Sequence, residues 1–180
     1  MGFDGPIILN VGELNANKNQ KTAILAFKEV VKQYPNARLL IAGKGEEREN
    51  LEQLADTEGI KEKVVFLGYT LELEKYSQIC DLGISCSYRE GLGINLIEIM
   101  LCGKPVVASH NRGHDELVQD GVNGYLVGAD QAGDYAQRIC EILSSEHPFA
   151  EAALQCAQPY TDRKVRSELA AILFEKEEPK

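Results

Sequence analysis

The chain has 180 residues, enough for one α/β domain with its own hydrophobic core, and its apolar and charged content is that of an ordinary globular protein. Its formal net charge of −9 argues against a nucleic-acid-binding protein, which would present a basic surface. No apolar run approaches the ~20 residues that span a bilayer, and the first residues show neither the basic nor the apolar segment of a secretory signal.

Short apolar runs alternate along the chain with segments of helical periodicity. Strands are predicted at residues 6–12, 38–43, 63–68, 82–86, 105–108 and 124–127. Helices are predicted at residues 18–34, 46–58, 71–80, 93–102, 115–120, 129–144, 149–156 and 162–176. Because the strands are continuously apolar, we expect helices on both faces of a parallel sheet. The pattern predicts one Rossmann-like domain over residues 1–180, an α/β doubly wound parallel six-stranded sheet with its core at about residues 7–145 and C-terminal helices at about 146–176.

The cysteines favour a reducing compartment. Their number is odd, and no pair has the CxxC spacing of a zinc or redox site. We therefore expect free thiols, mostly buried, and a cytoplasmic protein. The five residues are Cys80, Cys86, Cys102, Cys140 and Cys156.

Two loops are predicted to form a ligand crevice. In the commonest doubly wound order, 3-2-1-4-5-6, the first and fourth strands are neighbours, and ligands bind at their carboxyl ends. The loops that follow these strands are residues 12–18 and 87–93.

The second crevice loop is the more informative one. Gly91 and Gly93 precede a helix, whose free N–H groups and positive dipole end suit a diphosphate, although an ordinary strand-to-helix turn also uses glycines. Glu98 lies in an almost wholly apolar helix, where we expect it to lose much of its hydration and to reach back to the crevice, with Glu90 at the rim. Such carboxylates accept hydrogen bonds from the hydroxyls of a sugar-bearing ligand; pairing of Glu98 with a basic side chain is the alternative.

Lys18 is predicted to open the first helix beside the crevice and to bind a phosphate as a point charge, the alternative being a solvated lysine. The glycine turn at residues 41–46 lacks the GxGxxG spacing of dinucleotide-binding proteins. No aspartate pair with DxD spacing stands beside the crevice, so we expect no required metal.

Motifs in a fixed order carry a family resemblance. They are Val-Gly-x5-Lys at residues 11–18, Ile-Ala-Gly-x-Gly at 41–45, Glu-x7-Glu at 90–98 continuing to 108, and Gly-x-x-Glu to Gly at 113–124. Over about residues 7–145 the chain resembles the C-terminal domain of the group 1 glycosyltransferases, the retaining family 4 with GT-B architecture. The resemblance implies a domain that binds a nucleotide-diphosphate-sugar donor, with a UDP-sugar expected, in an enzyme that transfers a hexosyl group to a glycan or lipid-linked acceptor.

The same resemblance implies roles for individual residues. Glu90 and Lys18 are the catalytic pair, Glu90 holding hydroxyls of the donor sugar and Lys18 contacting the diphosphate. Gly91, Leu92 and Gly93 offer backbone amides to sugar and diphosphate, Glu98 binds the ribose hydroxyls, and Gly12 permits close approach. The remaining donor-binding residues are Gly43, in the turn after the second strand, and Gly68, Tyr69 and Leu73, near the base.

One position departs from the family pattern. Glu13 stands where the family usually has an arginine, and an acid facing a diphosphate would repel it. Either Glu13 points away, or phosphate binding rests on Lys18, the helix start and Arg89 or Lys44.

The resemblance also implies a partner. The family's N-terminal domain, which carries the acceptor site and a histidine near the reacting groups, has no counterpart here, so we expect the isolated chain to be inactive without that domain or a partner chain. His110, His114 and His147 do not match that histidine and are interpreted as surface or loop residues. Residues 162–176 either cross to the missing domain or pack on this one. Peripheral membrane association of the intact enzyme is compatible with the family.

Three other functions compete with the transferase hypothesis. A nucleotide-sugar epimerase shares the two-domain architecture, and the Glu-x7-Glu run disfavours it. A dinucleotide-dependent oxidoreductase is disfavoured by the missing GxGxxG motif. A non-catalytic nucleotide-sugar-binding subunit stays open.

Overall fold

The computed structural model describes residues 4–145, 149–161 and 164–165. In this part of the chain, parallel strands form a six-stranded sheet in the order β3-β2-β1-β4-β5-β6, which confirms the predicted doubly wound topology. The strands are β1 (Ile7–Val11), β2 (Arg38–Ala42), β3 (Val64–Gly68), β4 (Leu82–Ser85), β5 (Val106–Ser109) and β6 (Gly124–Val127).

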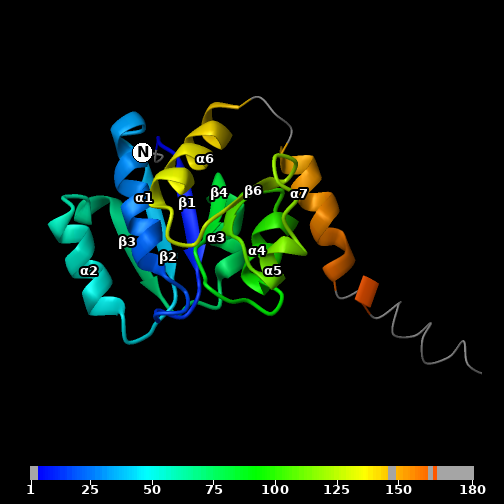
Figure 1. Cartoon of the computed structure of the whole chain (residues 1–180), viewed down its shortest axis with the longest axis horizontal. Helices are drawn as coiled ribbons and strands as arrows, with labels where there is room; N and C mark the ends of the chain where they lie inside the picture. Colours follow the sequence, from blue (N-terminus) through cyan, green and yellow to red (C-terminus); the bar gives the residue numbers. More distant parts are fainter. Residues whose placement is uncertain (1–3, 146–148, 162–163, 166–180) are drawn as a thin grey trace, which may run out of the picture.

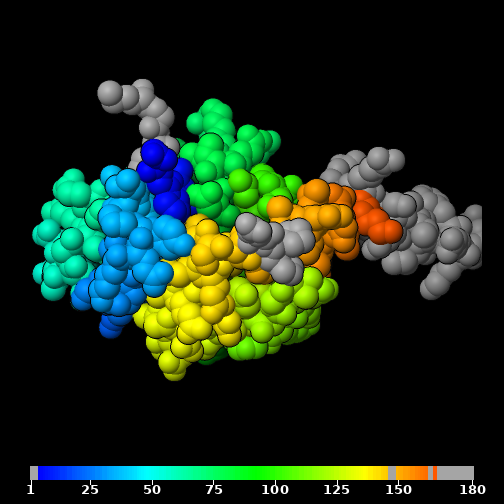
Figure 2. Space-filling view, turned by 90° about the horizontal axis from the view of Figure 1, so that it is seen from above, coloured from blue at the N-terminus to red at the C-terminus, as the bar shows by residue number. Residues whose placement is uncertain are grey.

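Helices cover both faces of the sheet (Figure 1). One face carries α1 (Gln20–Gln33), α2 (Arg48–Thr57) and α6 (Ala132–Ser144). The other face carries α3 (Leu73–Ile79), α4 (Ile94–Leu101) and α7 (Phe149–Ala157). α1 and α6 lie side by side, blue and yellow in Figure 2. The single-turn helix α5 (Arg112–Asp115) follows β5, and 3-10 turns occupy η1 (Lys61–Lys63) and η2 (Gln158–Tyr160).

The continuous apolar runs are explained by the two faces of each strand. Ile8 of β1 packs in the core beneath α1 and α6, whereas its neighbour Leu9 packs in the core beneath α4. Leu39 and Leu40 of β2 divide in the same way. Successive side chains of a strand point to opposite faces, so a sheet covered on both sides needs apolar residues at consecutive positions.

Several helices begin two or three residues from the predicted start, among them α2, α3 and α6, and for α1 and α5 the shift has an identifiable local cause. α1 begins at Gln20 and not at residue 18, because Asn19 adopts a left-handed backbone conformation with φ of 50°. The helix predicted at residues 115–120 lies instead at Arg112–Asp115. The side chain of Asn111 caps it by accepting a hydrogen bond from the His114 N–H at 3.1 Å. Both shifts arise from local polar contacts that the apolar periodicity does not report.

The C-terminal prediction is only partly covered. α7 agrees with the helix expected at residues 149–156. Of the helix expected at residues 162–176, only 164–165 lie within the described residues, and both are helical. Among the described helices, none has the length and apolarity needed to cross a membrane.

All five cysteines are free, as expected. Cys80 and Cys86 are buried, and burial raises the pKa of the Cys80 thiol to about 12. Cys102, Cys140 and Cys156 are only partly buried.

Candidate functional site

The two predicted crevice loops meet at the carboxyl ends of β1 and β4. These strands are neighbours in the sheet, with Leu9 opposite Gly83. The Tyr88 N–H donates a hydrogen bond to the Asn17 carbonyl at 2.9 Å, and Asn17 Nδ2 donates to the Arg89 carbonyl at 3.1 Å. The backbone of one loop is therefore fastened to the backbone of the other.

Lys18 and Glu90 form an ion pair between these loops. The Lys18 ammonium donates a hydrogen bond to Glu90 Oε1. Their side chains are 21% and 13% exposed, so the pair is partly shielded from water and more strongly coupled than a surface pair. Lys18 stands in the loop before α1 and not at the helix start that the sequence analysis expected. The two residues predicted as the catalytic pair are thus brought together, and they contact each other.

The start of α4 offers a set of unoccupied backbone donors. Gly93 precedes the helix with φ of 74°, a left-handed conformation that favours glycine. The backbone N–H groups of residues 90–95 make no hydrogen bond to any part of the described chain. Asn95 Nδ2 donates to the Val11 carbonyl at 2.8 Å and so holds this helix start against the end of β1. Free amides at a helix N-terminus are suited to an anion.

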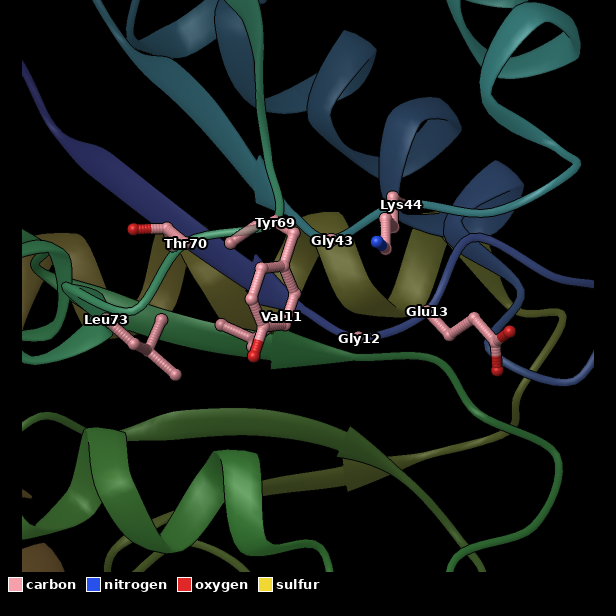
Figure 3. Close-up of a pocket in the computed structure, with 9 residues that line it drawn as sticks. Val11, Gly12, Glu13, Gly43, Lys44, Tyr69, Thr70 and Leu73 are labelled. Atoms are coloured by element: carbon pink, nitrogen blue, oxygen red, sulfur yellow. The ribbon is translucent and has the colours of Figure 1, made fainter.

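A mostly apolar cavity of about 390 Å³ lies on the other side of the β1 end (Figure 3). Gly43 carries φ of 149°, and a Cβ there would fall 1.8 Å from the Gly12 carbonyl oxygen, so only glycine permits the two loops to approach this closely. An apolar pocket with a few polar groups at its edge is typical of a small-molecule site. It is lined by Val11, Gly12, Glu13, Ala42, Gly43, Lys44, Tyr69, Thr70 and Leu73.

Two charged residues at the edge of this cavity point in different directions. Figure 3 shows the Glu13 side chain turned away from the cavity and the Lys44 side chain turned toward it. Glu13 Oε2 accepts a hydrogen bond from Asn15 Nδ2 at 2.9 Å, which holds the carboxylate in that direction. Lys44 Nζ lies 5.3 Å from the centroid of the Tyr69 ring, within cation–π range. The structure thus answers the question raised by Glu13, because its carboxylate does not face the ligand space.

The predicted site residues fall into two groups that meet at Gly12. Lys18 and residues 90–93 form the anion-facing group, and Gly43, Tyr69 and Leu73 line the cavity. Gly12 lines the cavity too, while a Cβ added to it would lie 3.3 Å from Lys18 Cδ. Gly68 does not line the cavity; its carbonyl accepts a hydrogen bond from the Gly43 N–H at 2.8 Å and supports the wall.

Glu98 differs from the sequence expectation. The residue is exposed overall, because its position on α4 faces outward while the neighbouring Ile97 and Ile99 are buried, so its carboxylate loses only part of its hydration. Partial burial still raises the pKa of its carboxyl above the usual value of 4.5. No basic side chain of the described residues forms an ion pair with it. The carboxylate is available to a ligand, although it does not line the cavity itself.

A buried polar network supports the second crevice loop from below. Ser109 Oγ donates to the Ser87 carbonyl at 2.5 Å, and Asn111 Nδ2 donates to the same carbonyl at 3.0 Å. His114 Nδ1 lies 2.9 Å from the Ser109 carbonyl. The Tyr135 hydroxyl donates to the Ser85 carbonyl at 3.0 Å. These side chains hold the strand end from which the loop to Glu90 starts.

The network corrects the interpretation of one histidine. His114 is fully buried and not a surface residue, because the short helix α5 turns it toward β5 and Gly93. Burial lowers the pKa of its imidazole below 6.5. His110 is exposed, as expected, and lies 3.1 Å from Asp115 Oδ1. His147 lies outside the described residues. The only signal for His114 was its place after Gly113 in the Gly-x-x-Glu motif.

A second contact missed by sequence reasoning closes the crevice at one end. The Tyr88 hydroxyl donates to Asp130 Oδ1 at 2.6 Å, and this hydrogen bond raises the pKa of the tyrosine. Asn19 Nδ2 donates to the Ala129 carbonyl at 3.0 Å. The loop after β6 is thereby joined to both crevice loops. Within the described ranges, no group of three or more potential metal ligands is present.

A doubly wound sheet with an anion-binding helix start and an apolar cavity at its switch point defines an α/β domain of the nucleotide-binding class. Residues 3–158 match the family of glycosyl transferases group 1, and the chain belongs to that family. It corresponds to the C-terminal half of the GT-B architecture.

Individual relatives agree with this assignment. EpsD of Bacillus subtilis is 37% identical over 136 residues, which are 76% of this chain and 36% of that protein. The D-inositol 3-phosphate glycosyltransferase of Mycolicibacterium smegmatis is 33% identical over 150 residues, which are 79% of this chain and 34% of that protein. HepE of Anabaena, solved in complex with UDP and glucose, superposes with a TM-score of 0.87 at 26% identity, covering 95% of this chain and 48% of HepE. The chain therefore spans about a third to a half of the length of these relatives.

Proposed function

We propose that this chain is the donor-binding half of a retaining glycosyltransferase and that its ligand is a nucleotide diphosphate sugar with a uridine base. The observation that carries the proposal is the meeting of the apolar cavity and the anion-facing group at Gly12. A planar base suits the cavity beside Tyr69, a diphosphate suits Gly12, Lys18 and the amides of residues 90–95, and a sugar then reaches Glu90.

Each contact follows from the chemistry of the groups. Carboxylates accept hydrogen bonds from hydroxyls, so Glu90 is assigned to the donor sugar and Glu98 to the ribose. Leu73 and Tyr69 give the base apolar contact, and Gly68 and Gly43 support that wall. Gly91, Leu92 and Gly93 present N–H groups to the phosphate oxygens and the sugar.

The proposed reaction transfers a hexosyl group to an acceptor hydroxyl of a glycan or a lipid-linked glycan. The bond between the anomeric carbon and the phosphate oxygen breaks, a bond to the acceptor oxygen forms, and the proton of the acceptor hydroxyl passes to the departing phosphate. Negative charge develops on the departing nucleotide diphosphate. Lys18 and the α4 amides stabilise that charge, and such preorganised electrostatic contacts supply a large share of enzymatic rate enhancement. The proposed reaction assigns no role to a metal.

Transfer is proposed to need a second domain. Because the chain spans about half of HepE, we propose that the acceptor site lies on an N-terminal GT-B domain or a partner chain, and that the chain alone binds donor without transferring sugar. The free thiols favour a cytoplasmic setting for this reaction. HepE, with its bound UDP and glucose, supports a uridine-based donor.

Calorimetric titration of the purified chain tests the proposal. The ligands are UDP, UDP-glucose, UDP-N-acetylglucosamine, GDP-mannose and NAD, each titrated into the wild type and Glu98→Ala. We expect saturable binding of UDP and of a UDP-sugar that is weakened in Glu98→Ala, and no binding of NAD. Binding of NAD in preference to UDP would favour the oxidoreductase alternative, and no binding of any nucleotide would refute a donor site on this chain.

A further inference from the structure

The charges around Gly12 do not balance those of a diphosphate. The positive charge of Lys18 is already matched by the negative charge of Glu90 in their ion pair. Glu13 adds a further negative charge on the same loop, although its carboxylate turns away. A cation that no carboxylate neutralises would strengthen the binding of a diphosphate at this place.

Lys44 is such a cation. No carboxylate of the described residues lies within ion-pair distance of its ammonium. It lines the cavity and points toward it (Figure 3). Arg89, the other basic residue near the crevice, is exposed and does not line the cavity. Lys44 is therefore the one of these two residues that has no carboxylate partner among the described residues and also lines the cavity.

The backbone around Lys44 is fixed against the first crevice loop. The Leu14 N–H donates a hydrogen bond to the Lys44 carbonyl at 3.0 Å. Gly43, the preceding residue, lies so close to the Gly12 carbonyl that no side chain fits between them. The Tyr69 ring, with its centroid 5.3 Å from Nζ, gives the ammonium a favourable aromatic face. Lys44 is therefore held at the cavity edge by contacts on both sides.

Gly12 is the residue that the surroundings of Lys18 and Lys44 have in common. The aliphatic stem of Lys18 passes over Gly12, with Cδ 3.3 Å from where a Cβ would lie, and Lys44 lines the cavity together with Gly12. The start of α4 is bonded to Val11, the residue before Gly12. Gly12 therefore lies beside the Lys18 stem and the helix start, and it borders the same cavity as Lys44.

We propose that Lys44 is the second cation of the diphosphate subsite and that, because Lys18 is engaged by Glu90, it supplies the net positive charge that binds the phosphates. This inference rests on the proposed function, since it requires a nucleotide diphosphate as ligand. The family usually has an arginine at the position of Glu13. In this chain the proposal assigns the corresponding phosphate contact to Lys44, in the loop after β2.

Calorimetry with UDP and uridine tests the assignment, since the two ligands differ only in the diphosphate. The variants are Lys44→Gln, which removes the charge, and Lys44→Arg, which keeps it. Lys61→Gln is the matched control, because Lys61 is an exposed lysine before β3, at the end of the parallel strands opposite to the cavity. Thermal melting of each variant reports folding. Titrations at low and high salt report the electrostatic share of binding.

We expect Lys44→Gln to lower UDP affinity about tenfold or more while uridine affinity is unchanged. Lys44→Arg and Lys61→Gln are expected to retain UDP affinity, and the salt dependence of UDP binding is expected to be weaker in Lys44→Gln. The inference fails if Lys44→Gln binds UDP like the wild type, if UDP and uridine lose affinity equally, or if Lys44→Arg loses as much as Lys44→Gln. Wild-type protein that binds no nucleotide refutes the donor site itself, and this assignment with it.

Discussion

The ammonium of Lys18 is ion-paired with the carboxylate of Glu90, which joins the loops after β1 and β4. A diphosphate that binds Lys18 has to compete with this carboxylate. We therefore expect Glu90→Gln to bind UDP about two- to fivefold more tightly than the wild type, because the competitor loses its charge. Lys18→Met is expected to bind UDP about tenfold or more weakly. Calorimetry measures both, and weaker UDP binding by Glu90→Gln would show that the pair assists UDP binding.

The ionised carboxylate of Glu98, which we expect to bind the ligand, is also expected to lower the stability of the folded chain. Partial burial raises the pKa of its carboxyl above 4.5 in the folded chain, so the folded state holds the proton more tightly than the unfolded state. Stability then falls as pH rises from 4.5 through the raised value, and the ionised form stays penalised at pH 7. We expect Glu98→Gln to melt slightly higher than the wild type at pH 7, with the difference vanishing near pH 4, while UDP affinity falls about tenfold. Equal melting temperatures at pH 7 would contradict the penalty.

His114 is expected to make stability depend on pH. Burial lowers the pKa of its imidazole below 6.5, so between that lowered value and 6.5 the unfolded state binds more protons. Stability is full above 6.5 and is lost as pH falls through this window. We expect His114→Leu to remove this pH dependence and, at pH 8, to cost about 1–3 kcal/mol, because the buried Ser109 carbonyl loses a partner. Melting curves from pH 5 to pH 8 measure it, with the exposed His110→Leu as the control that should follow the wild type.

The approach of Gly43 to Gly12 is expected to tolerate no side chain. In Gly43→Ala the new Cβ would fall 1.8 Å from the Gly12 carbonyl oxygen at a backbone φ of 149°, and we expect a loss of at least about 2 kcal/mol of folding stability. Gly91→Ala is the matched control, because a Cβ there meets nothing within 4 Å, and its folding stability should change by no more than about 0.5 kcal/mol. Urea denaturation compares them, and equal stabilities would mean that the two loops separate easily.

The strand order was predictable from the sequence, and so was the meeting of the two loops at the candidate site. Continuous apolar runs such as residues 82–86 and the helical periodicity between them report burial on both sides, which is a local property of each segment. The rule that ligands bind where the order of parallel strands reverses then selected the loops after β1 and β4. The starts of α1 and α5 were missed because Asn19 and Asn111 act through backbone and side-chain contacts that hydrophobicity does not register.

The sequence by itself determined the family, the sheet and the loops that carry the site, because these depend on short-range patterns of apolar residues and glycines. Only the tertiary structure decided how the charges are arranged. Lys18 meets Glu90 across 72 residues, Glu13 turns toward Asn15, and Lys44 is left facing the cavity. The exposure of Glu98 and the burial of His114 were likewise decided by the tertiary structure. Which charge pairs with which, and which side chain water reaches, depends on contacts between segments far apart in the chain, and those exist only once the sheet has assembled.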